Sequence, residues 1–172
     1  MSETIVIAEI NNGKVADVTA ELVSAVVAYG GRPTIIVPCV DSSIADGAGF
    51  AGAGRVIACK DSMFASYDAA GWAKALDVVT PAGTIFVAAS PRSKDLAARI
   101  AARRNLPVVQ DVVAIDGSKL ASPVYSGKAM QTVSVSADVV VSVRANIFAA
   151  AASAPAEVSV IDQSGDVLTA VE

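Results

Sequence analysis

Two hydrophobic patterns alternate along the first two thirds of the chain. Short apolar runs rich in β-branched residues predict buried strands. These runs lie at residues 4–8, 33–37, 55–60, 84–89 and 107–115. Between them, apolar residues recur three and four positions apart, which is the spacing of one face of a helix. The alternation of strands and helices predicts an α/β fold with a mostly parallel sheet covered by helices on both faces.

The clearest helical pattern precedes the second strand. Its apolar positions are Val15, Val18, Leu22, Val26 and Tyr29. Gly30 and Gly31 are expected to end this helix, because glycine adopts the left-handed cap conformation without steric cost. Three further helices are predicted at residues 42–51, 68–79 and 93–104, of which the first is weak and glycine-rich.

The pattern changes after Asp116, where strand-like segments follow one another with turns too short to hold helices. These segments lie at residues 120–125, 129–135 and 139–144. Consecutive strands joined by short turns pair antiparallel. We therefore expect a Rossmann-like three-layer sandwich with an antiparallel strand extension in its C-terminal third.

One domain is expected over residues 1–172, because a chain of this length can bury a proper core. We divide it into a parallel α/β part at 1–116, an antiparallel extension at 117–148 and a tail at 149–172. The tail is expected to contain an alanine-rich connector, a last strand at 157–161 and a loosely held end beyond Ser164.

Composition narrows the class of protein. With 53% hydrophobic and 17% charged residues, the chain is not expected to be disordered. Aromatic residues make up 5%, so alanine, valine and isoleucine must fill the interior. The net charge of −4 gives no reason to expect a nucleic-acid partner.

The opening residues have the pattern of a strand rather than a signal peptide, and no apolar run approaches the ~20 residues of a membrane span. We therefore expect a cytoplasmic protein without membrane insertion.

The absence of histidine from the sequence constrains the chemistry. A Ser-His-Asp triad, a Cys-His pair and nearly all catalytic zinc sites need this residue. Asp111 and Asp116 show no convincing convergent arrangement for acid–base catalysis. We expect no catalytic residue, no metal site and no enzyme activity of the chain's own. Cys39 and Cys59 leave a disulfide, a metal site or a nucleophile open, but we favour two small buried side chains in a reducing compartment.

A literal Gly-x-Gly-x-x-Gly pattern occurs at Gly47, Gly49 and Gly52. A dinucleotide site needs this pattern in the tight turn between a strand and a helix. Here the glycines lie inside or after a short helix, and the next strand begins near Arg55. We therefore interpret them as a flexible helix end and turn.

The loop at residues 90–95 is the best candidate binding site. It follows a predicted parallel strand, and open α/β sheets bind ligands at the carboxyl ends of their strands. Ser93 is expected to be the N-cap of the next helix, whose free N–H groups and partial positive charge favour an anion. Ser90, Arg92 and Lys94 would complete a site for a phosphate or a carboxylate. A plain helix cap explains the same residues and stays open as an alternative.

Two further features have both a structural and a functional interpretation. The helix at 93–104 is basic, which suits either a docking face for an acidic partner or an ordinary solvated face, and we favour the second. Tyr125, Gly127 and Lys128 interrupt the later strands. They would face a cofactor or a partner, or they simply form a hairpin turn.

Short motifs along most of the chain carry a resemblance through their shared order and spacing. They are Ile5-Val6-Ile7-Ala8-Glu9, Asn12-Gly13-Lys14, Lys94-Asp95, Ala98-Arg99-Ile100-Ala101, Val109-Gln110-Asp111-Val112, Pro123-Val124-Tyr125-Ser126-Gly127, and Val143-Arg144 with Phe148. In this order they resemble the amino-terminal domain of the electron transfer flavoprotein alpha subunit. The resemblance spans residues 4–148.

Three positions depart from that family's pattern. Ser93 stands where the family has glycine, Ser122 where it has arginine and Lys128 where it has asparagine. No Ser-Gly-Gly-Arg segment, which opens the family's flavin-binding domain, follows in this sequence. The resemblance implies a domain that supports the beta subunit and the flavin domain without holding the flavin, with the AMP site in the beta subunit. FAD is thus expected on a partner chain.

These observations predict an electron transfer flavoprotein alpha-related protein that acts as a structural or assembly component of a flavin-dependent electron transfer system. The expected partner is a beta-like or FAD-domain protein, or further copies of the chain in a homo-oligomer. The alternative is a module of the same fold that binds a small anion or AMP at residues 90–95.

Overall fold

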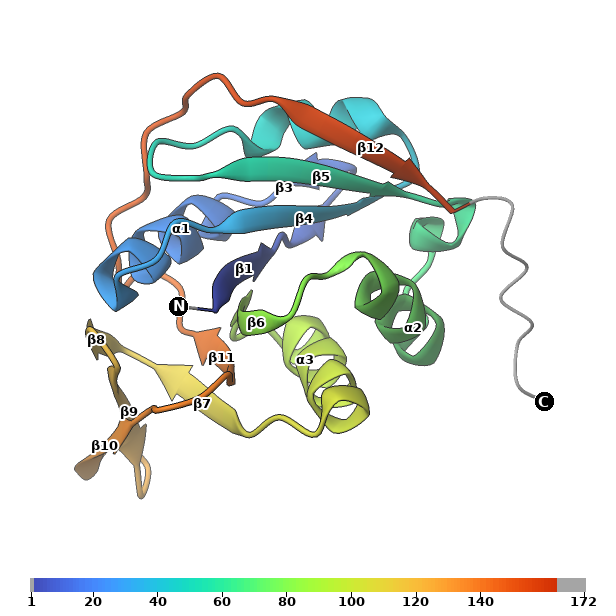
Figure 1. Cartoon of the computed structure of the whole chain (residues 1–172). Coiled ribbons are helices and arrows are strands. Elements are labelled where there is room, and N and C mark those ends of the chain that lie inside the picture. Colours follow the sequence, from blue (N-terminus) through green and yellow to red (C-terminus); the bar gives the residue numbers. More distant parts are fainter. Residues whose placement is uncertain (1, 164–172) are drawn as a thin grey trace.

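A seven-stranded parallel sheet forms the centre of the molecule in the computed structural model, which describes residues 2–163 (Figure 1). The strand order is β12-β5-β4-β1-β6-β11-β7, and each neighbouring pair is parallel. The strands are β1 (Glu3–Ile7), β4 (Thr34–Cys39), β5 (Arg55–Lys60), β6 (Gly83–Ala88), β7 (Val108–Val112), β11 (Val140–Val143) and β12 (Val158–Asp162).

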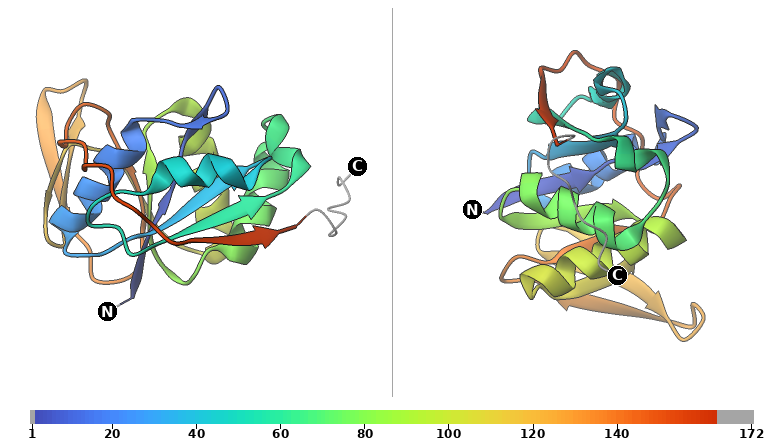
Figure 2. Two further views of the ribbon diagram at one scale, coloured as in Figure 1. Left: turned by 90° about the horizontal axis from the view of Figure 1, so that it is seen from above. Right: turned by 90° about the vertical axis from the view of Figure 1, so that its right-hand side faces the viewer.

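Helices cover both faces of this sheet (Figure 2). Helix α1 (Val18–Tyr29) and the 3₁₀ helix η1 (Ser42–Ala48) pack on one face. Helices α2 (Ala69–Val79) and α3 (Pro91–Arg104), with the 3₁₀ helix η2 (Ser62–Ala65), pack on the other. The predicted three-layer α/β sandwich with a mostly parallel sheet is therefore confirmed.

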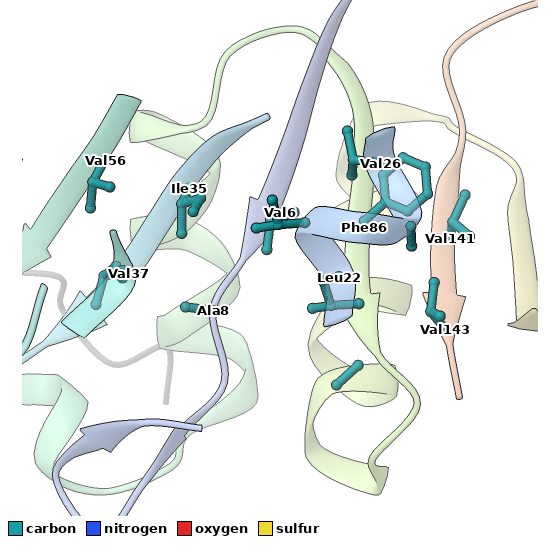
Figure 3. Packing of buried hydrophobic residues seen from close by; sticks show 14 of the residues in the cluster. Val6, Ala8, Leu22, Val26, Ile35, Val37, Val56, Phe86, Val141 and Val143 are labelled. Carbon is teal, nitrogen blue, oxygen red and sulfur yellow. The ribbon is translucent and has the colours of Figure 1, made fainter. Parts of the chain in front are cut away.

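Alternating side chains of the strands build two separate cores. Val6 of β1 lies on the α1 face with Leu22 and Phe86, as Figure 3 shows, whereas Ile5 and Ile7 lie on the face of α2 and α3. This follows from the two-residue period of a strand, which sends successive side chains to opposite faces. Full burial of such a side chain contributes about 1.5–3 kcal/mol, so strands that are apolar on both faces stabilise both cores.

A three-stranded antiparallel sheet projects from the body beside β7 (Figure 1). Its strands are β8 (Ala114–Asp116), β9 (Lys119–Val124) and β10 (Ala129–Ser134), in the order β10-β9-β8. Strand β9 carries Leu120, which is fully buried in the core under α1. A small hairpin of β2 (Ile10–Asn11) and β3 (Lys14–Val15) follows β1 around a turn at Asn12-Gly13.

One strand lies elsewhere than predicted. We expected residues 139–144 in the antiparallel extension, but β11 lies in the main sheet, parallel to β6 on one side and to β7 on the other. The physical reason is its burial: Val140, Val141 and Val143 are all inaccessible to solvent. A run that is apolar on both faces belongs between two helical layers and would be exposed in a projecting ribbon.

Smaller differences concern the ends of elements. The predicted strand at 107–115 is divided at Val113 into β7 and β8, and the weak helix at 42–51 is the 3₁₀ helix η1. The predicted last strand is confirmed as β12, which extends the main sheet beside β5. The end beyond Ser164 lies outside the described residues. Over residues 2–163, each helix is too short or too polar to cross a membrane.

Candidate functional site

The strand order places the candidate site at the carboxyl ends of the central strands of the sheet. From β1 the chain first adds β4 and β5 on one side, then crosses to add β6 on the other side. Open α/β sheets bind ligands beyond the carboxyl ends of the strands at such a reversal. Glu9 follows β1 and Ser90 follows β6, so these two residues meet at the reversal point.

The amino terminus of α3 begins one turn earlier than predicted. The N-cap is Ser90, whose Oγ accepts a hydrogen bond from the Ser93 N–H at 3.2 Å, and Pro91 is the first helical residue. The expectation that Ser93 is the N-cap was therefore wrong. Proline is favoured at the first helical position because its missing N–H is not needed there, and this shifts the cap to the residue before it.

The carboxylate of Glu9 occupies this helix end. Its Oε2 accepts hydrogen bonds from the Ser90 hydroxyl at 2.8 Å and from the Ser93 hydroxyl at 3.0 Å. A helix amino terminus favours negative charge, and here a side chain of the protein supplies it. Sequence reasoning missed Glu9 as a site residue. The available signal was an acidic residue directly after the first buried strand.

Arg92 and Lys94 diverge from this point toward different neighbours. The Lys94 ammonium forms an ion pair with Asp111 of β7, with 2.6 Å between Nζ and Oδ1. The Arg92 guanidinium lies over the ring of Tyr67, 5.5 Å from its centroid. The structure thus brings the four predicted residues to one helix end, but three of them are engaged by Glu9 or Asp111.

A cleft of about 590 Å³ opens at the reversal point; we call it the switch-point cleft. Its polar lining consists of Glu9, Asn11, Asp17, Ser90, Asp111 and Arg144. The guanidinium of Arg144 makes no hydrogen bond or ion pair with residues 2–163. Asp111 has a positive φ of 57°, and its N–H donates to the Ser142 hydroxyl at 2.9 Å, where the pairing of β7 with β11 is irregular.

A second cleft, of about 580 Å³, lies beside the first at the ends of β1 and β4; we call it the aromatic cleft. Phe64, Tyr67, Trp72 and Arg92 line it together with two asparagines and several apolar residues. The Tyr67 and Trp72 rings meet edge to face, 5.2 Å between centroids. The Tyr67 hydroxyl donates to Asp95 at 2.9 Å. Burial, this hydrogen bond and the negative charge of Asp95 together raise the pKa of Tyr67 to about 12, so the phenol is protonated at neutral pH.

The basic side chains of α3 are largely paired within the protein. Arg99 contacts Asp95 at 3.3 Å, and both Arg103 and Arg104 contact Asp77 of α2. These pairs leave less free positive charge than the sequence indicated. The geometry therefore favours the solvated-face interpretation over a docking face for an acidic partner.

The turn at Tyr125–Lys128 closes the hairpin between β9 and β10. Tyr125, Ser126 and Gly127 all have positive φ, at 53°, 57° and 82°. The unusual conformation expected for Gly127 is thus shared by two non-glycine residues, which is uncommon for a bulky side chain. Tyr125 is 79% exposed. None of these residues lines the switch-point or the aromatic cleft.

The two cysteines and the glycine pattern have structural roles. Cys39 and Cys59 are free and buried, as we favoured. Burial is the main cause that raises the pKa of Cys39 to about 11 and that of Cys59 to about 12, so both thiols stay protonated at neutral pH.

Gly49 follows η1, where a side chain would collide with the backbone carbonyl of Ala154. The absence of a side chain at Gly49 therefore allows the alanine-rich connector around Ala154 to pack closely against it. Gly49 does not lie in a strand-to-helix turn, which is where a dinucleotide site would need it.

These features define a doubly wound α/β protein in which ligands can reach the carboxyl ends of the central strands. The features are the reversal of strand order, the two clefts at these strand ends and the antiparallel ribbon. A family model described as the electron transfer flavoprotein domain matches residues 4–165. The chain therefore belongs to the electron transfer flavoprotein domain family, which confirms the resemblance seen in its motifs. No curated protein matches the chain in a sequence search.

Proposed function

We propose that the chain is an alpha-like electron transfer flavoprotein component that serves assembly, with the FAD held by a partner chain. The observation that carries this proposal is the family match, which runs through the whole parallel sheet. The partner would be a beta-like subunit or a separate FAD-domain protein. The chain would contribute no catalytic residues of its own, and its two buried free thiols suit the cytoplasm.

The chemistry of the sheet edge supports this proposal. A flavin or nucleotide phosphate needs free donors at a helix amino terminus. At α3 the hydroxyls of Ser90 and Ser93 already donate to Glu9, and Lys94 is paired with Asp111. A phosphate placed there would meet the Glu9 carboxylate and be repelled by it.

Co-purification tests the proposal. The purified chain should be colourless, and mixing it with a beta-like or FAD-domain partner should give a complex that elutes as one species in gel filtration. Failure of such partners to bind, or stoichiometric yellow flavin on the isolated chain, would contradict the proposed function.

A second candidate function is the binding of AMP or another small anion, and the aromatic cleft favours it. Arg92 extends over Tyr67 at the rim of this cleft, and Trp72 lines its wall. Aromatic rings stack on nucleobases, and a guanidinium binds phosphate. This would place the anion at Arg92 and away from the helix end that Glu9 occupies.

Trp72 is the single tryptophan of the chain, so its fluorescence reports directly on the aromatic cleft. Titration with AMP, ADP and ATP, followed by calorimetry, distinguishes the two functions. Saturable binding that is lost in Arg92→Ala and retained in Arg103→Ala, at the far end of α3, would favour the nucleotide module. No change in fluorescence or heat would exclude it.

A further inference from the structure

The outer edge of β10 has no strand beside it in the part of the chain that the structure describes. The antiparallel sheet has the order β10-β9-β8, so β10 pairs with β9 on one side only. Figure 1 shows this ribbon projecting from the body of the molecule. An edge strand presents backbone N–H and C=O groups that can pair with a strand of another chain.

The register of β9 and β10 decides which backbone groups face outward. Pro123, opposite Met130, has no N–H, so this pair is a non-hydrogen-bonded pair of the ladder. Beyond the strand end, the Val135 N–H donates to the Ser118 carbonyl at 2.9 Å, so odd-numbered positions face β9. The even-numbered residues of β10 therefore direct their N–H and C=O groups away from β9. These residues are Met130, Thr132 and Ser134.

This edge lacks the features that keep edge strands apart. Charged side chains, prolines and bulges normally protect such an edge. The six residues of β10 include no charge and no proline, and all six pair with β9 in unbroken register. The two outer strands of the main sheet do carry such features. Strand β12 has Asp162, which forms an ion pair with Lys60, and the pairing of β7 is interrupted by a bulge.

We propose that β10 pairs with β10 of a second copy of this chain, antiparallel, around a twofold axis at Thr132. Hydrogen-bonded pairs must join outward-facing residues. The register that pairs all three of them places Thr132 opposite itself and Met130 opposite Ser134. This pairing brings no like charges together, and an antiparallel strand edge is self-complementary under twofold symmetry. The neutral edge matches itself and offers no charge that would select a different partner.

The side chains beside the axis add to the backbone pairing. Met130 is 56% exposed and lies on the outer face of the ribbon opposite Pro123. In the dimer the two three-stranded sheets become one six-stranded sheet, and each Met130 packs beside Ser134 of the second copy. The inference rests on the strand edge alone, so it holds whether or not the chain joins a flavin-binding partner.

Sedimentation of the full chain over a range of concentrations tests the proposal. The parent chain should reach the mass of two chains, whereas Thr132→Pro should keep the mass of one. Proline removes an outward N–H and leaves the ladder to β9 intact. Thr132→Val keeps the N–H and should dimerise like the parent. Circular dichroism checks that each variant folds, and if Thr132→Pro does not, Thr132→Lys replaces it, since it sets two like charges opposite each other.

Cross-linking tests the register independently. Two Thr132→Cys side chains would lie on hydrogen-bonded partners with Cα atoms about 5.5 Å apart, a separation that a disulfide spans. Mild oxidation should convert most of this variant to a covalent dimer. Val78→Cys, at a 73% exposed position of α2, should stay at background. The native cysteines are buried and should not interfere.

Three results would overturn the proposal. The first is the mass of one chain at every concentration. The second is a dimer that Thr132→Pro or Thr132→Lys leaves unchanged, which would place the interface on another surface. The third is association of the ribbon with a different protein in the absence of self-association, which would assign the edge to that protein.

Discussion

Arg104, in the last turn of α3, ties two helices together. Its guanidinium contacts the Asp77 carboxylate and donates to the backbone carbonyls of Asp77, Thr80 and Pro81 at the end of α2. The carbonyls at a helix carboxyl end need donors, and a cation there also complements the helix dipole. Arg104 therefore lies in the last turn of its own helix, α3, and also caps the end of the neighbouring helix, α2.

The partner of Arg104 gives a prediction for the pH dependence of stability. Burial by itself would raise the pKa of Asp77, but hydrogen bonds from Arg104 and Arg103 outweigh it, and the pKa lies below the usual carboxyl value. A lowered pKa in the folded state adds stability above the pKa of the unfolded chain, about 4 for aspartate, and this stability is lost as pH falls through the folded value.

Asp77→Asn should therefore lower the free energy of unfolding by about 1–2 kcal/mol at neutral pH. The difference from the parent should shrink as the pH falls below about 4. Urea unfolding at several pH values measures this difference, with the exposed Asp116→Asn as the control. A difference that stays constant from neutral to acidic pH would contradict the assigned role of the ion pair.

Gly83 gives a second prediction for a single residue. It begins β6 beside β1, where a Cβ would collide with the backbone carbonyl of Glu3. Gly83→Ala should cost about 2–3 kcal/mol, because the backbone on the other side cannot move away. Gly47→Ala meets only ordinary contacts and should be nearly neutral. Thermal unfolding compares the two, and equal melting temperatures would show that the contact can relax.

Strands were the elements that the sequence predicted best. The runs at 4–8, 55–60 and 84–89 correspond closely to β1, β5 and β6, because a strand buried between two helical layers is apolar throughout. The position of β11 was not predicted, since periodicity reports burial and not the neighbours of a strand. Its insertion between β6 and β7 requires pairing with a strand that ends at Val112, nearly thirty residues earlier.

The candidate site at the amino terminus of α3 likewise depends on a long-range contact that the sequence did not reveal. The sequence located this helix end by its position after a strand, and its serines by their capping chemistry. It did not reveal that Glu9, eighty-one residues before Ser90, accepts hydrogen bonds from both serine hydroxyls. Long-range partners of this kind depend on strand order, which no local pattern encodes.

Removal of that carboxylate should expose an anion site. Glu9→Ala should lose about 1–2 kcal/mol of stability, because hydrogen bonds to a charged group are lost and the helix end loses its negative charge. Added sulfate should restore stability to this variant more than it stabilises the parent or Glu3→Ala, since sulfate also stabilises proteins in general. Equal sulfate effects on all three proteins would show that Glu9 does not occupy an anion position.

At the scale of the whole molecule, the protein consists of two cores, a sheet end with clefts and a projecting ribbon. The cores hold the parallel sheet between α1 on one face and α2 and α3 on the other. Two clefts open at the carboxyl ends of the central strands, and the carboxylate of Glu9 occupies the amino terminus of α3 beside them. Membership of the electron transfer flavoprotein domain family supports the proposal that the protein works through a flavin-binding partner.

Equilibrium dialysis of FAD against the isolated chain tests that account most directly. Visible absorbance should show the same flavin concentration on both sides of the membrane, because Ser90, Ser93 and Lys94 at the α3 terminus are already engaged by Glu9 and Asp111. An excess of one flavin per chain on the protein side would contradict the claim that this chain needs a partner to hold FAD.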